Sequence, residues 1–400
     1  MNEKIITVQE AKAILEEQTF QRKITRLNLA AAVGRVVTED LYAPIDIPAF
    51  DQSSMDGYAF AFKDWVPGTS LKVTSRIQAG ESSTNLLGPG EAARVFTGAP
   101  VPLGADTVVM QEKTMCNDGG LEISQPDLTQ GDNFRRRGAD IRKGELAIPE
   151  NTAITAAAVG FLGALGFAEV PVFAVPSVAI VITGNELQQP GKELIYGQVY
   201  EASSAMLQAC LSEMGIRNVT VFFTRDDLEE TIKTLRHSLE SFDVILVTGG
   251  VSVGDYDFVV KAAAQCDVER LFHKVKQRPG KPLYAGRKGN QPVFGLPGNP
   301  SSVLTCFYQY VWPLLRKIMG HPHTLKTFTV PLAAAYRKNN QLTHFLKGNY
   351  TEGKVTILSA QESYRLSSFA TANCLVVLNE TMRDYEKDEP VEINLLPVYG

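Results

Sequence analysis

The sequence predicts a multidomain chain that combines a parallel α/β domain with β-rich domains, and three observations support this. The length of 400 residues exceeds what one compact core usually holds, so two to four domains are expected. After residue 177, strand-like apolar runs alternate with helical runs, as in a parallel sheet covered by helices. Residues 43–142 and the tail after 325 instead carry short β-rich runs between turn residues, without helical connections.

The N-terminal part predicts helices on either side of a β-rich block. Thr7 to Glu17 carries the capping-box pair Thr7 and Glu10 and an apolar face, which predicts a helix. A second amphipathic piece covers about 27–42, and the Ala-rich run 151–165 predicts another helix. The β block is therefore interpreted as an insertion into a helical stalk.

Four parts follow from this pattern. The expected boundaries are a discontinuous helical stalk (1–45 and 143–176), an inserted β-rich domain (46–142), an α/β domain (177–325) and a C-terminal β-barrel or sandwich (326–400). Within the α/β domain, the predicted strands are 178–182, 219–223, 244–247 and 293–296, and the predicted helices are 203–214, 227–239, 258–265 and 300–319.

Composition excludes several classes of protein. A net charge of -5 argues against a general nucleic-acid binder, because such proteins depend on clustered positive charge. The five cysteines are far apart and form no CxxC pair, which favours reduced thiols in the cytoplasm. Met1–Lys4 lacks the apolar segment of a signal peptide, and no run is long enough to span a bilayer.

The strongest local signal is the glycine-rich turn after the buried run 244–247. Gly249, Gly250 and Gly254 permit tight turning, and amides at such a turn before a helix favour an anion. Asp255 and Asp257 stand beside it, so we expect a phosphorylated substrate, with Mg²⁺. A plain strand-to-helix turn with capping acids is the alternative. Because GxxxxGK[ST] and GxGxxG are both missing after this strand, a nucleotide triphosphatase or a dinucleotide dehydrogenase is disfavoured.

Acids follow other strands of the same predicted sheet. Glu186 comes after the first strand and Asp226 after the second, and parallel topology brings both to the ligand end together with Asp257. Carboxylates of this kind suit Mg²⁺, so Glu186 and Asp226 are the candidate metal ligands. For Asp226 and its neighbour Asp227, simple helix capping explains the residues equally well.

Two rigid, polar turns complete the predicted site. Lys274, Lys276, Arg278 and Lys281 surround Pro279-Gly280, a pattern that indicates an oxyanion patch or an exposed basic turn. Pro297-Gly298-Asn299-Pro300 joins the last strand to a helix. Asn299 is placed as the cap and Pro300 as the first helical residue, but the loop also suits an anion.

The inserted block contains motifs that are ambiguous one by one. Asp56-Gly57 is a common hairpin signal, Phe96 to Pro100 is equally open, and Arg135-Arg136-Arg137 is usually a solvated turn that is able to hold a phosphate. The five histidines of the sequence form no HExxH motif, so a zinc mechanism of that kind has no support.

The ordered set of these motifs resembles the molybdopterin molybdenumtransferase family, which includes the E domain of gephyrin. The resemblance covers nearly the whole chain, and the order of the motifs is far more specific than any one of them. The segments that carry it are 50–59, 96–102, 135–141, 183–187, 249–254, 279–282 and 295–300.

This resemblance implies an elongated homodimer with a molybdopterin-binding-type α/β domain, in which each site lies between the α/β domain of one subunit and the inserted domain of the other. It implies insertion of molybdate into adenylylated molybdopterin, with Mg²⁺-dependent release of AMP, and a transient contact with the molybdopterin adenylyltransferase. The family's catalytic residues fall on Asp56, Thr97, Asp140, Glu186, Asp226 and Asp257. Residues expected to bind substrate are Gly249, Gly250, Ser252, Gly254, Lys276, Arg278, Lys281, Pro297, Gly298, Asn299, Pro300, Arg135 and Ser368.

Some positions depart from the common family pattern. Asn185 replaces an Asp, and Arg278 replaces the first lysine of a Lys-Pro-Gly-Lys turn. The segment 341–345 lacks an arginine that some members carry. Two other functions stay open at this point: a non-catalytic scaffold, which would not need the acids, and a hydrolase of another phosphorylated pterin or nucleotide, which would not need molybdate.

Overall fold

The computed structural model describes residues 5–81, 86–118, 120–251 and 258–397. The chain divides into two compact units, one formed by Met1–Thr25 with Phe173–Gly400 and the other by Arg26–Val172. No helix of the described residues is long and apolar enough to cross a membrane.

A mixed sheet forms the centre of the first unit. Its strand order is β16-β13-β17-β21-β20-β18. The strands are β13 (Val178–Thr183), β16 (Val219–Thr224), β17 (Val244–Thr248), β18 (Glu269–His273), β20 (Tyr284–Lys288) and β21 (Gln291–Leu296). The first four in the order are parallel, as the sequence predicts, whereas β20 and β18 add an antiparallel edge that the sequence did not reveal.

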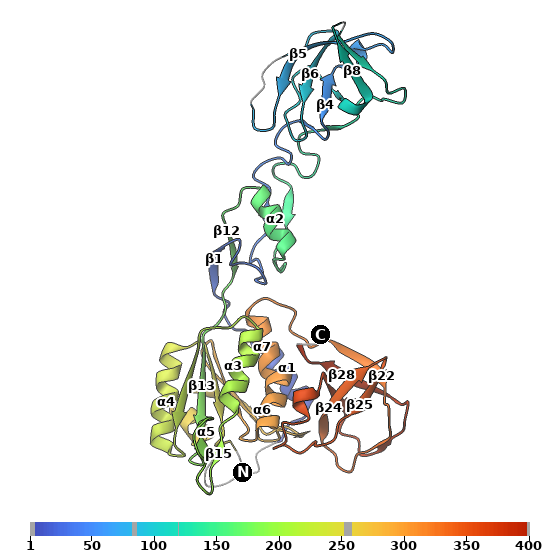
Figure 1. Ribbon diagram of the computed structural model, residues 1–400. Coiled ribbons are helices and arrows are strands. Elements are labelled where there is room, and N and C mark those ends of the chain that lie inside the picture. The colour runs from blue at the N-terminus through green and yellow to red at the C-terminus, as the bar shows by residue number, and fades with distance from the viewer. Residues whose placement is uncertain (1–4, 82–85, 119, 252–257, 398–400) are drawn as a thin grey trace. The chain divides into compact units, whose positions relative to one another are not determined.

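Helices cover both faces of this sheet (Figure 1). Successive residues of β13 pack into different cores: Val178 and Ile180 pack on one side, and Ala179 and Val181 on the other. This two-sided burial is why the strand is a continuous apolar run. The helices are α1 (Val8–Glu17), α3 (Ser203–Glu213), α4 (Leu228–Ser241), α5 (Phe258–Gln265), α6 (Pro300–Cys306) and α7 (Trp312–Ile318). Clusters of buried residues place α4 and α5 on one face and α1, α3, α6 and α7 on the other.

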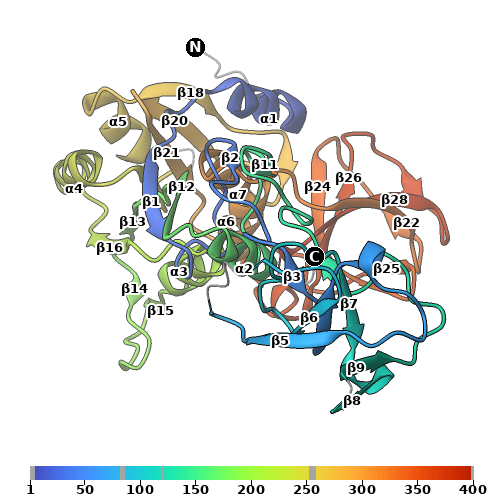
Figure 2. The same ribbon diagram turned by 90° about the horizontal axis from the view of Figure 1, so that it is seen from above.

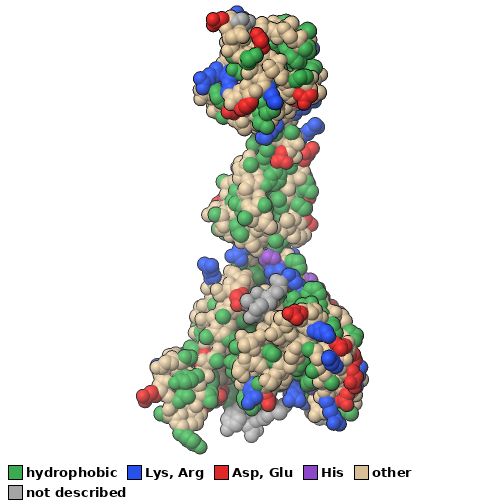
Figure 3. Space-filling model, turned by 45° about the vertical axis from the view of Figure 1, so that its right-hand side comes forward, with side chains coloured by type: hydrophobic (Ala, Val, Ile, Leu, Met, Phe, Trp, Pro, Cys, Tyr) green, Lys and Arg blue, Asp and Glu red, His purple; other side chains and the backbone are tan. Residues whose placement is uncertain are grey.

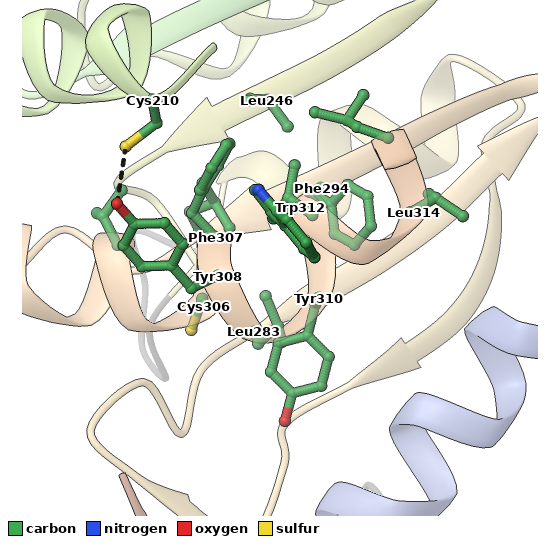
Figure 4. Packing of buried hydrophobic residues seen from close by; sticks show 14 of the residues in the cluster. Cys210, Leu246, Leu283, Phe294, Cys306, Phe307, Tyr308, Tyr310, Trp312 and Leu314 are labelled. Atoms are coloured by element: carbon green, nitrogen blue, oxygen red, sulfur yellow. Dashed lines mark hydrogen bonds between the residues drawn. The ribbon is translucent and has the colours of Figure 1, made fainter. Parts of the chain in front are cut away.

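The predicted helix 300–319 contains a π-helical segment, Phe307–Val311, between α6 and α7. All five residues of this segment are buried. Figure 4 shows the result: Tyr308 points toward Cys210 of α3, while Tyr310 points away from it. A π-bulge changes the direction in which the side chains after it point, and such bulges are frequent at functional sites.

A second sheet lies in the C-terminal part of the same unit, with strand order β19-β24-β26-β28-β22 and β25 paired to β24. An isolated bridge between Leu332 and Val355 connects the segment after β22 with β25. One bridge of this kind does not close the sheet into a barrel, so a closed C-terminal barrel stays a prediction. The strands are β19 (Gln277–Arg278), β22 (Thr327–Pro331), β24 (Thr343–Thr351), β25 (Lys354–Ile357), β26 (Cys374–Leu378) and β28 (Pro390–Leu395). Two ribbons complete the unit, β14 (Leu187–Gln188) with β15 (Val199–Tyr200) and β23 (Tyr336–Arg337) with β27 (Asp384–Tyr385).

The second unit is built mainly of short strands. Its largest sheet has the order β5-β6-β4-β7, from β4 (Gly57–Phe60), β5 (Lys72–Ile77), β6 (Glu91–Val95) and β7 (Thr107–Met110). Short ribbons surround it: β8 (Thr114–Asn117) with β9 (Gly120–Ile123), β10 (Phe134–Arg135) with β3 (Gln52–Ser53), and β11 (Leu146–Ile148) with β2 (Leu41–Tyr42). A further pair joins β1 (Ile24–Asn28) and β12 (Glu169–Phe173).

The helical character expected around the inserted block is reduced to one α-helix among the described residues of 26–172, α2 (Ala156–Ala164). The amphipathic piece 27–42 is not a helix. After β1 it forms a turn that ends at Gly34, whose φ of 77° a helix does not allow. Val36 and Val37 then form extended bridges with Ala153 and Val172, which explains their apolar pattern without a helix.

Surface charge is mixed, as the small net charge suggests. Figure 3 shows acidic and basic side chains intermingled on the visible face of both units. All five cysteines are free thiols, and Cys116 is the exposed one. Seen from above in Figure 2, the helices α4 and α5 stand beside the parallel strands, and the strands of the C-terminal sheet form a separate layer.

Candidate functional site

A cleft of about 990 Å³ lies at the carboxyl ends of the parallel strands of the first unit. A residue just beyond each parallel strand lines it: Gly184 directly after β13, Asp226 two residues after β16, Gly249 directly after β17 and Pro297 directly after β21. This is the ligand end expected for a parallel α/β sheet. The volume lies at the upper end of the about 300–1,000 Å³ typical of small-molecule sites, so the cleft admits a nucleotide-sized molecule.

Glycine is required at the floor of the cleft. Gly249 and Gly250 have φ values of 83° and 61°. A Cβ on Gly249 would lie 2.6 Å from Thr183 Oγ1 and 2.7 Å from the Thr183 carbonyl oxygen. The Gly249 amide already donates to the Leu296 carbonyl (3.2 Å), so it does not point to a ligand, unlike the free amide that the sequence suggested. Ser252, Gly254, Asp255 and Asp257 lie outside the described residues.

Two of the predicted acids, Glu186 and Asp226, line this cleft together. The Glu186 carbonyl accepts a hydrogen bond from Val199 (2.9 Å), and the Asp226 amide donates to Asn185 Oδ1 (3.3 Å). Within the described ranges, no group of three or more His, Cys, Asp or Glu residues could hold a metal ion without further ligands. Mg²⁺ commonly takes one or two carboxylates, substrate phosphates and water, so this pair fits magnesium that binds with its substrate.

The basic turn is held from behind by a buried glutamine. Gln277 Nε2 donates to the carbonyls of Pro279 (3.2 Å) and Gly280 (3.0 Å), and the Tyr310 hydroxyl of the π-helical segment donates to Gln277 Oε1. A Cβ on Gly280 would lie 2.5 Å from Cys306 Sγ, which explains the glycine. The turn therefore has a fixed shape.

Of the predicted cations, Arg278 and Lys281 line the cleft, but Lys276 does not. Lys276 is exposed, and its backbone amide and carbonyl pair with Ile6 (2.8 Å) and Thr343 (2.9 Å). These two positive side chains stand in the same cleft as the acids Glu186 and Asp226, with Glu201 and Glu362 also in its lining, an arrangement that suits an anion bridged to a metal.

The loop of Pro297 to Pro300 lines the cleft as predicted, but the side chain of Asn299 does not cap the helix that follows. Its Nδ2 donates instead to Ser363 Oγ at 3.0 Å, and its backbone carbonyl accepts from Ser302 and Val303. The amide side chain is therefore used to connect the α/β part of the cleft to the C-terminal part of the chain.

The C-terminal wall of the cleft was missed by sequence reasoning. Gln361, Glu362, Ser363 and Tyr364 line the cleft from a loop after β25. Ser368, the residue expected there, is buried, does not line the cleft, and donates to the Ala360 carbonyl (2.8 Å). Tyr200 and Glu201 were also missed as lining residues. The Glu201 carboxylate accepts from the Ser204 amide (2.8 Å) at the start of α3.

In the second unit, the three sequence motifs of the inserted block converge. The Ser53 amide donates to the Ala99 carbonyl (3.0 Å), and the Ser54 amide donates to the Asn133 carbonyl (2.9 Å). Arg135 pairs in register with Gln52. Segments near residues 53, 98 and 134 therefore meet in one region of this unit although they are far apart in sequence.

Asp56 and Thr97 are in direct contact within this region. The Thr97 amide (2.7 Å) and hydroxyl (2.8 Å) both donate to Asp56 Oδ1. The two hydrogen bonds, with the Arg94 guanidinium nearby, lower the pKa of Asp56 below its ordinary value. Asp140 and Arg135 are exposed side chains of the same unit. The region thus presents a carboxylate that is held ionised and oriented.

Comparison with protein families matches three successive parts of the chain. Residues 6–166 match the MoeA N-terminal region (domain I and II), 179–317 match a probable molybdopterin binding domain, and 329–396 match the MoeA C-terminal region (domain IV). The molybdopterin molybdenumtransferase of Haemophilus influenzae is 32% identical over 405 residues, which cover 97% of this chain and 98% of that protein. The chain belongs to the molybdopterin molybdenumtransferase family.

Further relatives support membership of this family. The molybdopterin molybdenumtransferase of Staphylococcus aureus is 32% identical over 405 residues, covering 98% of this chain and 95% of that protein. The crystal structure of the molybdopterin biosynthesis MoeA protein from Pyrococcus horikoshii is 30% identical, with a TM-score of 0.86 and coverage of 98% and 99%. The multidomain MoeA-like fold expected from the ordered motifs is thereby confirmed in its main lines.

Proposed function

We propose that this chain is a molybdopterin molybdenumtransferase, which inserts molybdate into adenylylated molybdopterin and releases AMP to give molybdenum cofactor. The observation that supports this most is the cleft of about 990 Å³, in which Arg278 and Lys281 stand with Glu186 and Asp226 at the carboxyl ends of one sheet. A phosphate-bearing substrate with bound Mg²⁺ requires both kinds of group in one place.

In this proposal each wall of the cleft has its own task. Arg278 and Lys281 bind the oxyanions, on a turn whose shape Gln277 fixes. Glu186 and Asp226 would hold Mg²⁺, which supplies charge neutralisation at the phosphoanhydride as AMP leaves. The Pro297–Pro300 loop and the wall of Gln361 to Tyr364 enclose the pterin and limit the access of water.

We propose further that the protein is a cytoplasmic homodimer, in which Asp56, Thr97, Asp140 and Arg135 of one subunit serve the cleft of the other. Asp56 is oriented and held ionised by Thr97, as a group that positions water or substrate should be. Because the substrate is the product of the molybdopterin adenylyltransferase, a transient contact with that enzyme belongs to the same proposal.

The decisive experiment measures AMP release from adenylylated molybdopterin by the purified chain. We expect release that requires both molybdate and Mg²⁺ and stops on chelation. Glu186→Gln and Asp226→Asn should each lower the rate by about 10²-fold or more while the circular dichroism spectrum stays unchanged. Release that is independent of molybdate would support the hydrolase alternative, and no release under any condition would refute the proposal.

The homodimer is tested by subunit mixing. Asp56→Asn and Glu186→Gln chains, each inactive alone, are combined by denaturation and refolding at equal amounts. If each site draws on both subunits, half of the dimers carry one intact site of two, so about a quarter of the wild-type rate returns. If each site lies within a single chain, the mixture stays inactive.

A further inference from the structure

A lysine whose ammonium donates to no carboxylate of the described residues is buried behind the C-terminal wall of the cleft. Lys347 lies on β24 and is 1% exposed. Its Nζ donates to three oxygens: the carbonyls of Ala360 (2.7 Å) and Arg365 (3.1 Å) and the hydroxyl of Ser301 (3.3 Å). The three acceptors match the three donors of an ammonium group. Burial lowers the pKa of Lys347 to about 8; Glu362 raises it and Arg365 lowers it further.

Burying this charge is expensive, so its geometry requires an explanation. Removing an ammonium group from water costs free energy, whereas burying an apolar side chain of equal size stabilises the fold. The Phe369 ring, 5.9 Å from Nζ, and three neutral oxygens offset that cost only in part. A methionine would fill the same space without this cost, which indicates that the hydrogen bonds of Lys347 matter for the site.

The backbone of Lys347 holds the same loop as its side chain does. Its amide donates to Gln361 Oε1 (3.0 Å), and its carbonyl accepts from Gln361 Nε2 (2.8 Å) and from the Leu358 amide (2.9 Å). Ala360, whose φ of 58° is unfavourable for a residue with a Cβ, is fixed by Lys347 and by Ser368 through one carbonyl oxygen. The loop is thus anchored near its start and, through Arg365, at its end.

The opposite side of this loop faces the cleft. Gln361, Glu362, Ser363 and Tyr364 line it, and Ser363 accepts the hydrogen bond of Asn299. Ser301, the third acceptor of Lys347, lies in the first turn of α6, directly after the Pro297–Pro300 loop. The ammonium therefore joins, from behind, two walls that meet in the cleft.

We propose that Lys347 is a positioning residue: its ammonium sets the separation between the Gln361–Tyr364 wall and the Pro297–Pro300 loop, and so determines substrate affinity without contact with substrate. The part that concerns affinity rests on the function proposed above, whereas the part that concerns the loop does not. The residue acts through the loop, so its loss should raise KM while the chemical step is retained.

The test compares Lys347→Met with the wild-type chain in two measurements. The first is hydrogen exchange of the full-length chain. Amides of Leu358 and Arg365 in the loop, and of Ser302 and Val303 in α6, should exchange at least about tenfold faster, while those of β13 stay unchanged. The second is steady-state AMP release, in which KM for molybdate should rise about tenfold or more with kcat within about twofold.

Lys338→Met is the matched control. Lys338 is also 1% exposed in the C-terminal part, but its Nζ donates to the carbonyls of Asn340 and Thr381 and not to the loop. It should lower the melting temperature without the exchange pattern or the change in KM. Lys347→Arg, which keeps a cation and donors, should restore part of both effects.

The outcomes separate the inference from the proposed function. Unchanged exchange of the loop in Lys347→Met would overturn the positioning role, whatever the enzyme does. Faster exchange with an unchanged KM would overturn the role in affinity.

If the wild-type chain releases no AMP, the proposed function fails. Calorimetric binding of AMP to the wild-type and Lys347→Met chains then decides the role in affinity. If Lys347→Met does not fold, Ser301→Ala, which removes one acceptor, must still speed exchange in the 358–365 loop; unchanged exchange there would again overturn the role.

Discussion

Thr97 donates two hydrogen bonds to the same oxygen of Asp56, from its amide at 2.7 Å and from its hydroxyl at 2.8 Å. Both partners lie in loops next to the sheet of the second unit, Asp56 before β4 and Thr97 after β6, and these strands pair antiparallel. The register of two strands therefore fixes a carboxylate against its donors. The consequences can be measured.

Thr97→Val should raise the pKa of Asp56 toward its ordinary value of 3.8, because the hydroxyl donor is lost while the amide donor stays. Thr97→Ser should leave it low. The folded-state pKa is depressed, so this carboxylate stabilises the fold above the unfolded pKa, and the effect is lost as pH falls through the folded value. NMR titration of the Asp56 carboxyl carbon in the three proteins gives the answer, and equal pKa values in all three would contradict it.

Gly249→Ala and Gly298→Ala should separate folding from ligand approach. Gly249 has φ 83° and its added Cβ would meet Thr183 at 2.6 Å, so alanine should destabilise the chain by about 1–3 kcal/mol. Among the described residues, a Cβ on Gly298 would have only the Gly249 Cα within reach, at 3.9 Å, so alanine there should unfold like the wild type. Denaturant unfolding measures both. If Gly298→Ala nevertheless raises KM, a ligand approaches the backbone there; equal stability of the two variants would contradict the steric account.

Tyr308 and Tyr310 are both buried in the π-helical segment, but only Tyr310 contacts Gln277, so the two allow a controlled test of what holds the basic turn. Tyr310→Phe removes the donor to Gln277 Oε1, so we expect a loss of about 1–2 kcal/mol and weaker anion binding at Arg278 and Lys281. Tyr308→Phe loses only the acceptor for Cys210 Sγ, at 3.7 Å, and should leave anion binding unchanged. Calorimetric titration with molybdate or AMP distinguishes them, and a similar loss of affinity in both would remove the special role of Tyr310.

His344 should make the C-terminal sheet sensitive to acid. Burial, with Lys338 and Arg278 nearby, lowers its pKa from 6.5 to about 4, and Nε2 pairs with Asn340 while Nδ1 faces the Tyr336 hydroxyl. Between these values the unfolded chain binds more protons, so stability present above pH 6.5 is lost as pH falls toward 4. The contribution is at most about 3 kcal/mol. His344→Gln should flatten the profile of melting temperature against pH over this range; an unchanged slope would contradict the prediction.

Much of the α/β domain followed from the sequence because its signals are local. The run Val178–Thr183 is buried on both faces, and such a strand carries apolar residues throughout. Strand ends in a parallel sheet share one edge, so the joint position of Glu186 and Asp226 in the cleft could be predicted without coordinates. The segment 27–42 was misread because amphipathic spacing also fits two valines that form extended bridges on partners more than 100 residues away.

The rest of the site depends on contacts that no local pattern encodes. Ser368 was expected to bind substrate, but its hydroxyl turns inward to Ala360, and Ser363, five residues earlier, faces Asn299 instead. Asn299 has the sequence context of a helix cap, yet its side chain finds a partner 64 residues along the chain. Competition between a local and a distant hydrogen-bond partner is decided by packing, which sequence spacing does not report.

The sequence by itself determined the parallel strands of the sheet, the position of Glu186, Asp226, Arg278 and Lys281 in the cleft and the glycines at 249 and 250, because each depends on residues near one another in the chain. Tertiary structure alone decided that the C-terminal loop 361–364 closes the cleft, that Gln277 and Tyr310 hold the basic turn, and that Lys347 anchors the wall from behind. These contacts join residues far apart in sequence, which come together because both sheets pack in one core with α6 and the π-helical segment.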